Sequence, residues 1–223
     1  MIKFTLLATL ALSTVLSSVS AATVQGKVSV APRRGPAATL SETLVSLQPA
    51  TPVKPRKPEN VLMTTRAKTL VPHIIAVPVG STVQFPNDDP ILHNLFSVSS
   101  PNNFDLGLYR RNSGKSQTFN ASGIVNIYCN VHPSMSAVLH VMSTPYYVFA
   151  DNSGAFAIPD VPAGKYVLTA WNEVGGATQA QLEVTASGEV RGTTNVLLDG
   201  KTLRPAQHLN KHGQPYSRST NDY

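Results

Sequence analysis

The stretch "GIVNIYCNVHPSMSAVLHVM", residues 123–142, holds two alternating segments separated by a short polar loop. Apolar side chains recur at every second position in residues 123–129 and again in residues 136–142. A period of two is typical of half-buried strands, and the proline between them marks a turn. We therefore expect two strands joined by a tight loop at one end of a β-sandwich. Three side chains can converge there: Cys129, His132 and Met135.

The chain begins with the features of a secretory signal peptide. Lys3 precedes an apolar run that ends in Val19-Ser20-Ala21-Ala22, which gives a charged start, an apolar centre and a small-residue cleavage site. The run is too short and too weakly apolar for a stable membrane span. We expect cleavage after Ala21 or Ala22, so that residues 1–22 are the signal peptide. The mature protein is then periplasmic or secreted, with no transmembrane segment.

Cys129 is the single cysteine of the 223 residues, which is unusual because cysteines in oxidising compartments are normally paired. It could form an intermolecular disulfide, stay a buried inert thiol or bind a metal. Its neighbours favour a metal, since one thiolate, two imidazoles and a weak axial thioether form the trigonal set that binds copper. Cys129, His132 and Met135 would supply three ligands. His93, in a polar turn after the strand-like run "GSTVQF", is the best candidate for the fourth.

Other interpretations of these residues are weaker. A zinc site would use a closed tetrahedral set and has little use for a thioether. Haem attachment needs a second cysteine, in the pattern Cys-x-x-Cys-His. A catalytic Cys–His pair is possible in principle, but the end of a strand is an unusual place for it. Multicopper oxidases need more copper centres than the six histidines of this chain can supply. We therefore expect no enzyme activity.

These motifs resemble those of a known family. The runs "VPVGSTVQFPN", "HN" and "YCNVHPSM", at residues 77–87, 93–94 and 128–135, are similar to pieces of the cupredoxins, the small blue-copper domains of the plastocyanin and amicyanin type. The resemblance covers residues 59–143, and the Cys-x2-His-x2-Met spacing is closer to the short ligand loop of amicyanin. It implies a Greek-key β-sandwich with one type 1 copper that cycles between Cu(II) and Cu(I). The implied ligands are His93, Cys129, His132 and Met135.

The resemblance also implies roles for two asparagines. The backbone amide of Asn94 would donate a hydrogen bond to the Cys129 sulfur, and the side chain of Asn87 would tie the two ligand loops together. Asp88 and Asp89 stand nearby, and both are expected to lie in a solvent-exposed turn.

The remaining histidines carry plainer expectations. His140 lies on an alternating strand and is expected to be a surface residue or a hydrogen-bonded strand residue, and His73 is expected to be structural. His208 and His212 belong to the polar segment 201–223, which we expect to be a disordered tail.

The rest of the chain predicts a second β-sandwich. Residues 146–173 combine closely spaced turn signals with the alternating strand "KYVLTAW", and further strands follow, a pattern typical of all-β sandwiches. This part resembles the carboxypeptidase regulatory-like (transthyretin-like) sandwich, a module with no catalytic residues of its own. We expect an all-β chain in which the cupredoxin is inserted into a sandwich made of residues 23–50 and 145–200. The alternative is that residues 23–50 extend the cupredoxin sheet.

The formal net charge of +6 does not indicate nucleic-acid binding. The basic excess lies in the Pro-rich N-terminal region, including "PVKPRKPEN" at residues 52–60, and in the tail, whereas residues 144–200 are acidic. Such basic segments are linker-like, and the chain has no basic face interleaved with aromatic residues. Weak attraction to an acidic redox partner or membrane surface is the better interpretation.

Two functions of different classes fit the sequence. In the first, the protein carries single electrons between redox partners. His132, expected near the surface of its loop, would be the residue through which electrons leave. The apolar rim around it would consist of Ile91, Leu92 and Pro133. In the second, the protein stores, delivers or senses copper, for which an exposed site richer in Met and His is expected. One compact set with a thiolate and two imidazoles favours electron transfer. A weaker third possibility is that the second sandwich docks the copper domain on another envelope protein.

Overall fold

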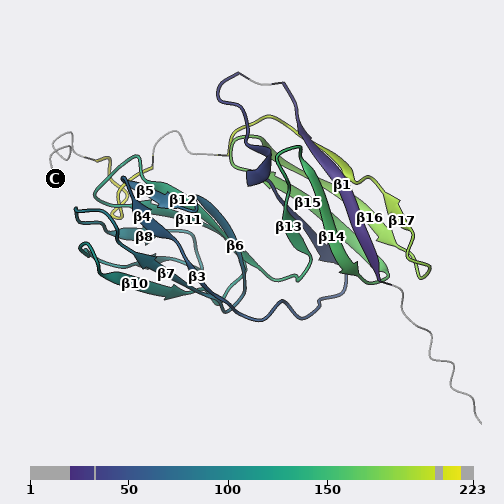
Figure 1. Cartoon of the computed structure of the whole chain (residues 1–223), viewed down its shortest axis with the longest axis horizontal. Coiled ribbons are helices and arrows are strands. Elements are labelled where there is room, and N and C mark those ends of the chain that lie inside the picture. Colours follow the sequence, from purple (N-terminus) through teal and green to yellow (C-terminus); the bar gives the residue numbers. More distant parts are fainter. Residues whose placement is uncertain (1–20, 33, 204–207, 217–223) are drawn as a thin grey trace, which may run out of the picture.

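The computed structural model describes residues 21–32, 34–203 and 208–216. These ranges form β-strands and one 3-10 turn, η1 (Leu40–Glu42), which confirms the prediction of an all-β chain. Figure 1 shows two lobes side by side. We call the lobe of residues 60–142 the middle sandwich, and the lobe of residues 22–49 and 147–198 the outer sandwich.

The predicted signal peptide falls, apart from its last two residues, outside the described part of the chain. Within that part, no helix has the length and apolar character needed to span a membrane.

The middle sandwich has one sheet of order β10-β7-β3, a second of order β6-β12-β11-β8-β9, and a small hairpin of β4 and β5. Its core holds fully buried apolar side chains such as Phe85, Ile127 and Leu139. The strands are β3 (Asn60–Leu62), β4 (Thr64–Arg66), β5 (Thr69–Val71), β6 (Ile74–Pro78), β7 (Thr82–Pro86), β8 (Leu95–Ser97), β9 (Phe104–Asp105), β10 (Gly114–Thr118), β11 (Gly123–Cys129) and β12 (Ser136–Met142).

The outer sandwich also has two sheets, of order β14-β1-β18 and β13-β2-β15-β16-β17. Val28 of the first sheet and Leu168 of the second are fully buried in the core between them. The strands are β1 (Ala22–Val30), β2 (Leu44–Pro49), β13 (Tyr147–Phe149), β14 (Ala155–Val161), β15 (Gly164–Asn172), β16 (Gly176–Val184), β17 (Val190–Gly192) and β18 (Asn195–Leu198).

The first two strands lie in the outer sandwich. β1 pairs with β14 and β18, and β2 pairs with β13 and β15. Among the strands that the structure describes, neither pairs with a strand of residues 60–142. The pairing corresponds to the inserted arrangement rather than to an extension of the middle sheet. The domain boundaries themselves stay a prediction.

The two sandwiches meet along β12 and the end of β15. Trp171 of β15 packs on Ile74 and Val138, and its ring lies 4.4 Å from that of His140 in an edge-on contact. Nearby, a nitrogen of His73 is 2.7 Å from a carboxylate oxygen of Glu173. His73 is thus structural, as expected, and joins the two lobes.

His140 corrects an expectation. Its side chain is buried, and its Nε2 atom has no hydrogen-bond partner among the described residues. The alternation that placed it on a surface face fails because β12 is covered on that side by Trp171 of the outer sandwich. Burial lowers the pKa of His140 to about 4.

The hairpin of β11 and β12 forms as the alternation predicts. Val125, Ile127 and Cys129 are buried, whereas the residues between them are exposed or half-buried. The last pair of the ladder joins Tyr128 to Ser136, so residues 129–135 form the loop at the end of the sandwich. That loop and the segment before β8 carry the predicted ligands His132, Met135 and His93, and Cys129 lies where β11 meets the loop.

Candidate metal centre

His93 and Cys129 are fixed on neighbouring segments by backbone pairing. His93 exchanges two backbone hydrogen bonds with Tyr109, of 3.1 and 2.9 Å. Cys129, the last residue of β11, pairs with Leu95 of β8, only two residues beyond His93. The backbone amide of Asn130 donates to the carbonyl of Asn94 at 2.8 Å. These bonds set the separation of the two segments that carry the site.

The loop after β11 folds back so that His132 joins the other two residues. The Met135 amide donates to the His132 carbonyl at 3.0 Å, and the Cys129 amide donates to the Met135 carbonyl at 3.1 Å. A tight turn of this kind, with Pro133 inside it, holds His132 over the end of β11.

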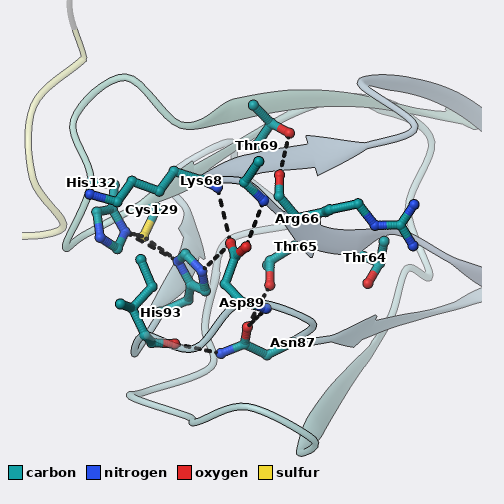
Figure 2. A network of polar contacts seen from close by, with 12 residues as sticks. Thr64, Thr65, Arg66, Lys68, Thr69, Asn87, Asp89, His93, Cys129 and His132 are labelled. Carbon is teal, nitrogen blue, oxygen red and sulfur yellow. Dashed lines mark hydrogen bonds and ion pairs between the residues drawn. The ribbon is translucent and has the colours of Figure 1, made fainter.

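Three donor atoms converge in the space so formed, as Figure 2 shows. The Cys129 sulfur is 3.7 Å from Nδ1 of His93 and 3.6 Å from Nδ1 of His132, and the two Nδ1 atoms are 3.2 Å apart. All three side chains are buried. Within the described residues they are the group of His, Cys, Asp and Glu side chains whose ligand atoms are close enough to hold one metal ion.

The dimensions of this triangle fit a metal ion. A point equidistant from the three atoms lies about 2 Å from each, and nitrogen and sulfur ligands lie ~2.0–2.3 Å from zinc in proteins. The chemistry of the set selects copper, because soft thiolate together with imidazole is the trigonal copper arrangement. The residues present therefore fit a copper ion.

Met135 belongs to the same loop and is buried, with 1% of its surface exposed. It packs in the core cluster that also contains Cys129 and Tyr109. A trigonal Cys and His set for copper is completed by a weak axial thioether, and Met135 supplies a thioether in this loop. The structure thus brings all four predicted ligand residues to one end of the middle sandwich.

Asp89 fixes the orientation of the His93 ring. Its carboxylate lies 2.9 Å from Nε2 of His93, so that this nitrogen carries the proton and Nδ1 is left with a free lone pair for a metal. The carboxylate also accepts the backbone N–H groups of Ala67 and Lys68, the latter at 3.0 Å. Ala67 and Lys68 form the tip of the β4–β5 hairpin, with φ angles of 50° and 57°.

This finding corrects the expectation for Asp89, which is 5% exposed rather than in solvent; Asp88 is exposed, as expected. Burial raises the pKa of Asp89, but the hydrogen bonds from Lys68, His93 and Ala67 outweigh it, so the pKa lies below its usual value. Residue type alone could not show this. The signal in the sequence is the carboxylate four positions before His93.

The histidines and the thiol of the site are held in their neutral forms. Burial lowers the pKa of His93 despite the nearby Asp89, and burial followed by the proximity of His93 lowers the pKa of His132. Burial raises the pKa of the Cys129 thiol, although the backbone amides of Asn94, Val131 and His132 hydrogen-bond the sulfur and oppose that rise. A metal must therefore displace the thiol proton on binding.

Asn94 and Asn87 act on different parts of the site. The Asn94 amide reaches the Cys129 sulfur, as the resemblance implies. Asn87 donates to the carbonyls of Ile91 and Tyr109 and accepts from Thr65 and from the Asp89 amide. Among the described residues, none of these side-chain partners belongs to the Cys129 loop, so Asn87 stabilises the His93 turn rather than linking it to that loop.

His132 differs from expectation in its exposure. Only 6% of its surface is exposed, and Nε2 has no hydrogen-bond partner among the described residues. The ring lies under its own loop and near the side chain of Lys68 (Figure 2). The apolar rim is only partly open: Leu92 is 48% exposed, whereas Ile91 and Pro133 are half-buried.

Comparison with known proteins gives partial matches. A family model described as polysaccharide lyase family 4, domain II, matches residues 120–191, which run from β11 to β17 and cover well under half of the chain. No curated protein sequence matches. None of these comparisons shows the carboxypeptidase regulatory-like module.

Similar solved structures include three copper proteins. A novel purple cupredoxin from Nitrosopumilus maritimus is 22% identical, with a TM-score of 0.34, over 37% of this chain and 99% of that one. An amicyanin variant in its reduced Cu(I) form at pH 4 is 18% identical, with a TM-score of 0.36, over 44% and 98%. A Cu-containing nitrite reductase from Thermus scotoductus SA-01 is 23% identical, with a TM-score of 0.36, over 42% of this chain and only 25% of its own length. At these scores, the argument for copper rests on the donor atoms and not on the neighbours.

Proposed function

We propose that this protein is an exported single-electron carrier with one type 1 copper. Cys129, His93 and His132 would hold the metal, with Met135 as a weak axial ligand. The observation that carries the proposal is the buried convergence of one sulfur and two Nδ1 atoms, 3.2–3.7 Å from one another. Bound there, copper supplies a one-electron Cu(II)/Cu(I) couple.

The frame around the donor atoms favours electron transfer over metal delivery. The His93 ring is fixed through Asp89, and three backbone amides are directed at the Cys129 sulfur. These contacts keep the same donor atoms in place whichever charge the metal carries. Burial of all the donors also slows the ligand exchange that a delivery protein needs.

The same burial supports a carrier rather than an enzyme. The side chains of His93 and Cys129 have no exposed surface and that of His132 has 6%, which leaves little room for a substrate to reach the metal. Catalytic metal sites keep an open position for a substrate or water. A compact electron carrier needs no such opening.

A redox partner would dock at the end of the sandwich that carries the His132 loop. His132 remains the ligand nearest that surface, and Leu92 and Leu108, 48% and 61% exposed, offer apolar contacts beside it. The signal peptide predicted for residues 1–22 would place this exchange in the periplasm or outside the cell.

Copper storage, delivery or sensing is the alternative, and redox cycling separates it from electron transfer. Protein loaded with one equivalent of Cu(II) would be reduced with ascorbate and reoxidised with ferricyanide in the presence of the Cu(I) chelator bathocuproine disulfonate. A carrier keeps its copper through repeated cycles. Transfer of the metal to the chelator at the first reduction would establish delivery instead. His212→Ala, at an exposed position, should behave like the wild type, whereas His132→Ala should lose copper.

A further inference from the structure

The C-terminal segment crosses to the copper end of the middle sandwich. Residues 208–216 follow the outer sandwich in sequence, and Figure 1 shows this yellow segment against the middle one. These residues fall within the tail that the sequence predicts to be disordered, yet their contacts with the middle sandwich are numerous and specific. The contacts gather on the two segments that carry His93 and Cys129.

Lys211 contacts the Cys129 loop directly and the His93 segment through Asp105. Its ammonium nitrogen is 2.6 Å from a carboxylate oxygen of Asp105, and its backbone amide donates to the side-chain oxygen of Asn130 at 3.0 Å. Asp105 in turn accepts a hydrogen bond of 2.6 Å from the side chain of Asn94. Asn94 follows His93 and Asn130 follows Cys129, so one lysine is connected to the neighbour of each ligand.

Tyr216 reaches the thiolate ligand itself through the backbone. Its hydroxyl donates to the carbonyl oxygen of Cys129 at 2.9 Å. Burial raises the pKa of Tyr216 well above its usual value, which keeps the hydroxyl protonated and able to donate. The contact adds a hydrogen bond to the end of β11, whose Cys129 amide already donates to the Met135 carbonyl.

His208 adds a stacking contact to the same strand. Its ring lies 4.2 Å from that of Tyr128, at an interplanar angle of 19°, and meets the Tyr216 ring edge-on at 5.3 Å. Tyr128 directly precedes Cys129. Residues 208–216 thus contact Tyr128, Cys129 and Asn130, three consecutive residues centred on the thiol.

We propose that residues 208–216 form a strap that positions the copper ligands, with Lys211 and Tyr216 as its positioning residues. As a statement about copper, this inference rests on the proposed function. The Cys129 loop and the His93 segment are also joined by the pairing of β11 with β8, by the backbone hydrogen bond between Asn130 and Asn94, and by the contacts of the Cys129 sulfur. The strap adds an ion pair, two hydrogen bonds and a ring stack to that joint.

The strap also tethers the two sandwiches. Thr202 and Leu203, which follow the outer sandwich, donate to the Glu173 carbonyl at 3.2 and 2.7 Å. Further along the chain, His208, Lys211 and Tyr216 contact the middle sandwich. The outer sandwich thereby anchors one end of a segment whose other end holds the metal ligands. This gives the outer sandwich a part in the stability of a site that it does not itself contain.

Thiol reactivity of the metal-free full-length chain tests the strap without copper. Cys129 is fully buried, so modification by dithionitrobenzoate requires local opening, whose population depends on the contacts that hold the loop. Lys211→Ala combined with Tyr216→Phe removes an ion pair and a hydrogen bond. Modification should become about tenfold faster, because the ion pair and the hydrogen bond together contribute about 1.4 kcal/mol, which corresponds to a factor of ten. The matched control is Lys201→Ala combined with Tyr146→Phe, which removes no side-chain hydrogen bond of the described residues.

A second arm measures copper in the same three proteins: the wild type, the strap variant and the control. Release of reduced copper to bathocuproine disulfonate should also become about tenfold faster in the strap variant, while its thermal unfolding midpoint stays close to that of the control. Thiol and copper-release rates equal to those of the control would overturn the strap. A faster thiol reaction in a protein that binds no copper would uphold the strap as a brace of this loop and overturn the proposed function.

Discussion

The main apolar cluster of the outer sandwich contains Tyr166, and the buried Tyr147 and Glu173 lie outside that cluster, whereas the middle sandwich gathers four buried polar side chains at one end: Asp89, His93, Cys129 and His132. Both lobes bury aliphatic side chains between two sheets, and that burial is enough to form them. The buried polar cluster lowers the stability of the middle sandwich unless its members are hydrogen-bonded or bind a metal. The buried polar cluster thus places the candidate metal site in the middle sandwich.

Opening an equal cavity in each core tests whether the two sandwiches differ in their effect on the metal site. Leu168 of the outer sandwich and Leu139 of the middle one are both fully buried. Each Leu→Ala change should lower the free energy of unfolding by about 3 kcal/mol. Only Leu139→Ala should also shift the visible absorption of the copper-loaded protein, because β12 adjoins the ligand loop. Chemical denaturation and absorption spectra measure the two effects. A shifted band in Leu168→Ala would show that the chemistry is not confined to the middle sandwich.

Asp89→Asn tests whether the buried carboxylate serves the site. The amide cannot accept hydrogen bonds from His93 and from the hairpin amides as the carboxylate does, so the ring loses its fixed orientation. Removal of such a partner typically weakens metal binding by about 10–100-fold. Competition with a chelator measures the change in Kd. Asp88→Asn is the matched control, since Asp88 is exposed and its side chain pairs with Arg66 at 3.2 Å rather than with His93. Equal affinities for the two variants would assign Asp89 a structural role alone.

His140 should make the junction of the sandwiches sensitive to acid. Its folded-state pKa is about 4, below the unfolded value of about 6.5. The unfolded state therefore binds more protons between these values, and stability falls as the pH falls from about 6.5 to 4. At pH 5 the contribution is a loss of about 2 kcal/mol relative to pH 7 or above.

Comparison of His140→Phe with wild-type metal-free protein isolates this effect, because the buried site histidines are common to both. Denaturation at pH 7 and pH 5 should show a pH-dependent loss smaller by about 2 kcal/mol in the variant. His212→Phe, at an exposed position, should retain the wild-type pH dependence. Identical losses in all three proteins would mean that His140 becomes accessible to protons without unfolding.

Arg56 should contribute the smallest of these effects. Its guanidinium donates to the carbonyls of Pro145 and Tyr147, both at 2.8 Å, and lies 4.0 Å from the centre of the Tyr147 ring. Cation–π contacts at exposed sites contribute ~0.5–1 kcal/mol. Arg56→Ala should lower the unfolding free energy by about that amount, with Lys57→Ala as the control. An unchanged midpoint would show that the linker before β3 is not held to the outer sandwich by this residue.

The sequence predicts the local features of the molecule well. Residues 123–129 and 136–142 form strands because alternation is a local property, and the short loop between them places Cys129, His132 and Met135 near one another. His93 could be chosen because a strand-like run precedes it. In each case a few neighbouring residues carry the information.

The features that the sequence could not predict depend on segments far apart in the chain. Asp89 is buried because the hairpin tip 22 positions earlier caps it. His140 is covered by Trp171 of the other lobe, and Cys129 is contacted by Tyr216, 87 positions later. Composition marked the tail as polar but could not indicate which surface it would contact.

The visible absorption spectrum after addition of one equivalent of Cu(II) tests the proposed type 1 copper site most directly. It would be recorded for the purified mature protein and for Cys129→Ser. If Cys129, His93 and His132 hold a type 1 copper, the wild type should show an intense blue band that a reductant bleaches and an oxidant restores. The variant should show none, because the sulfur that gives the band is gone. A colourless wild-type protein, or one that binds Zn²⁺ as tightly as copper, would contradict the proposed type 1 copper site and leave Cys129 a buried thiol.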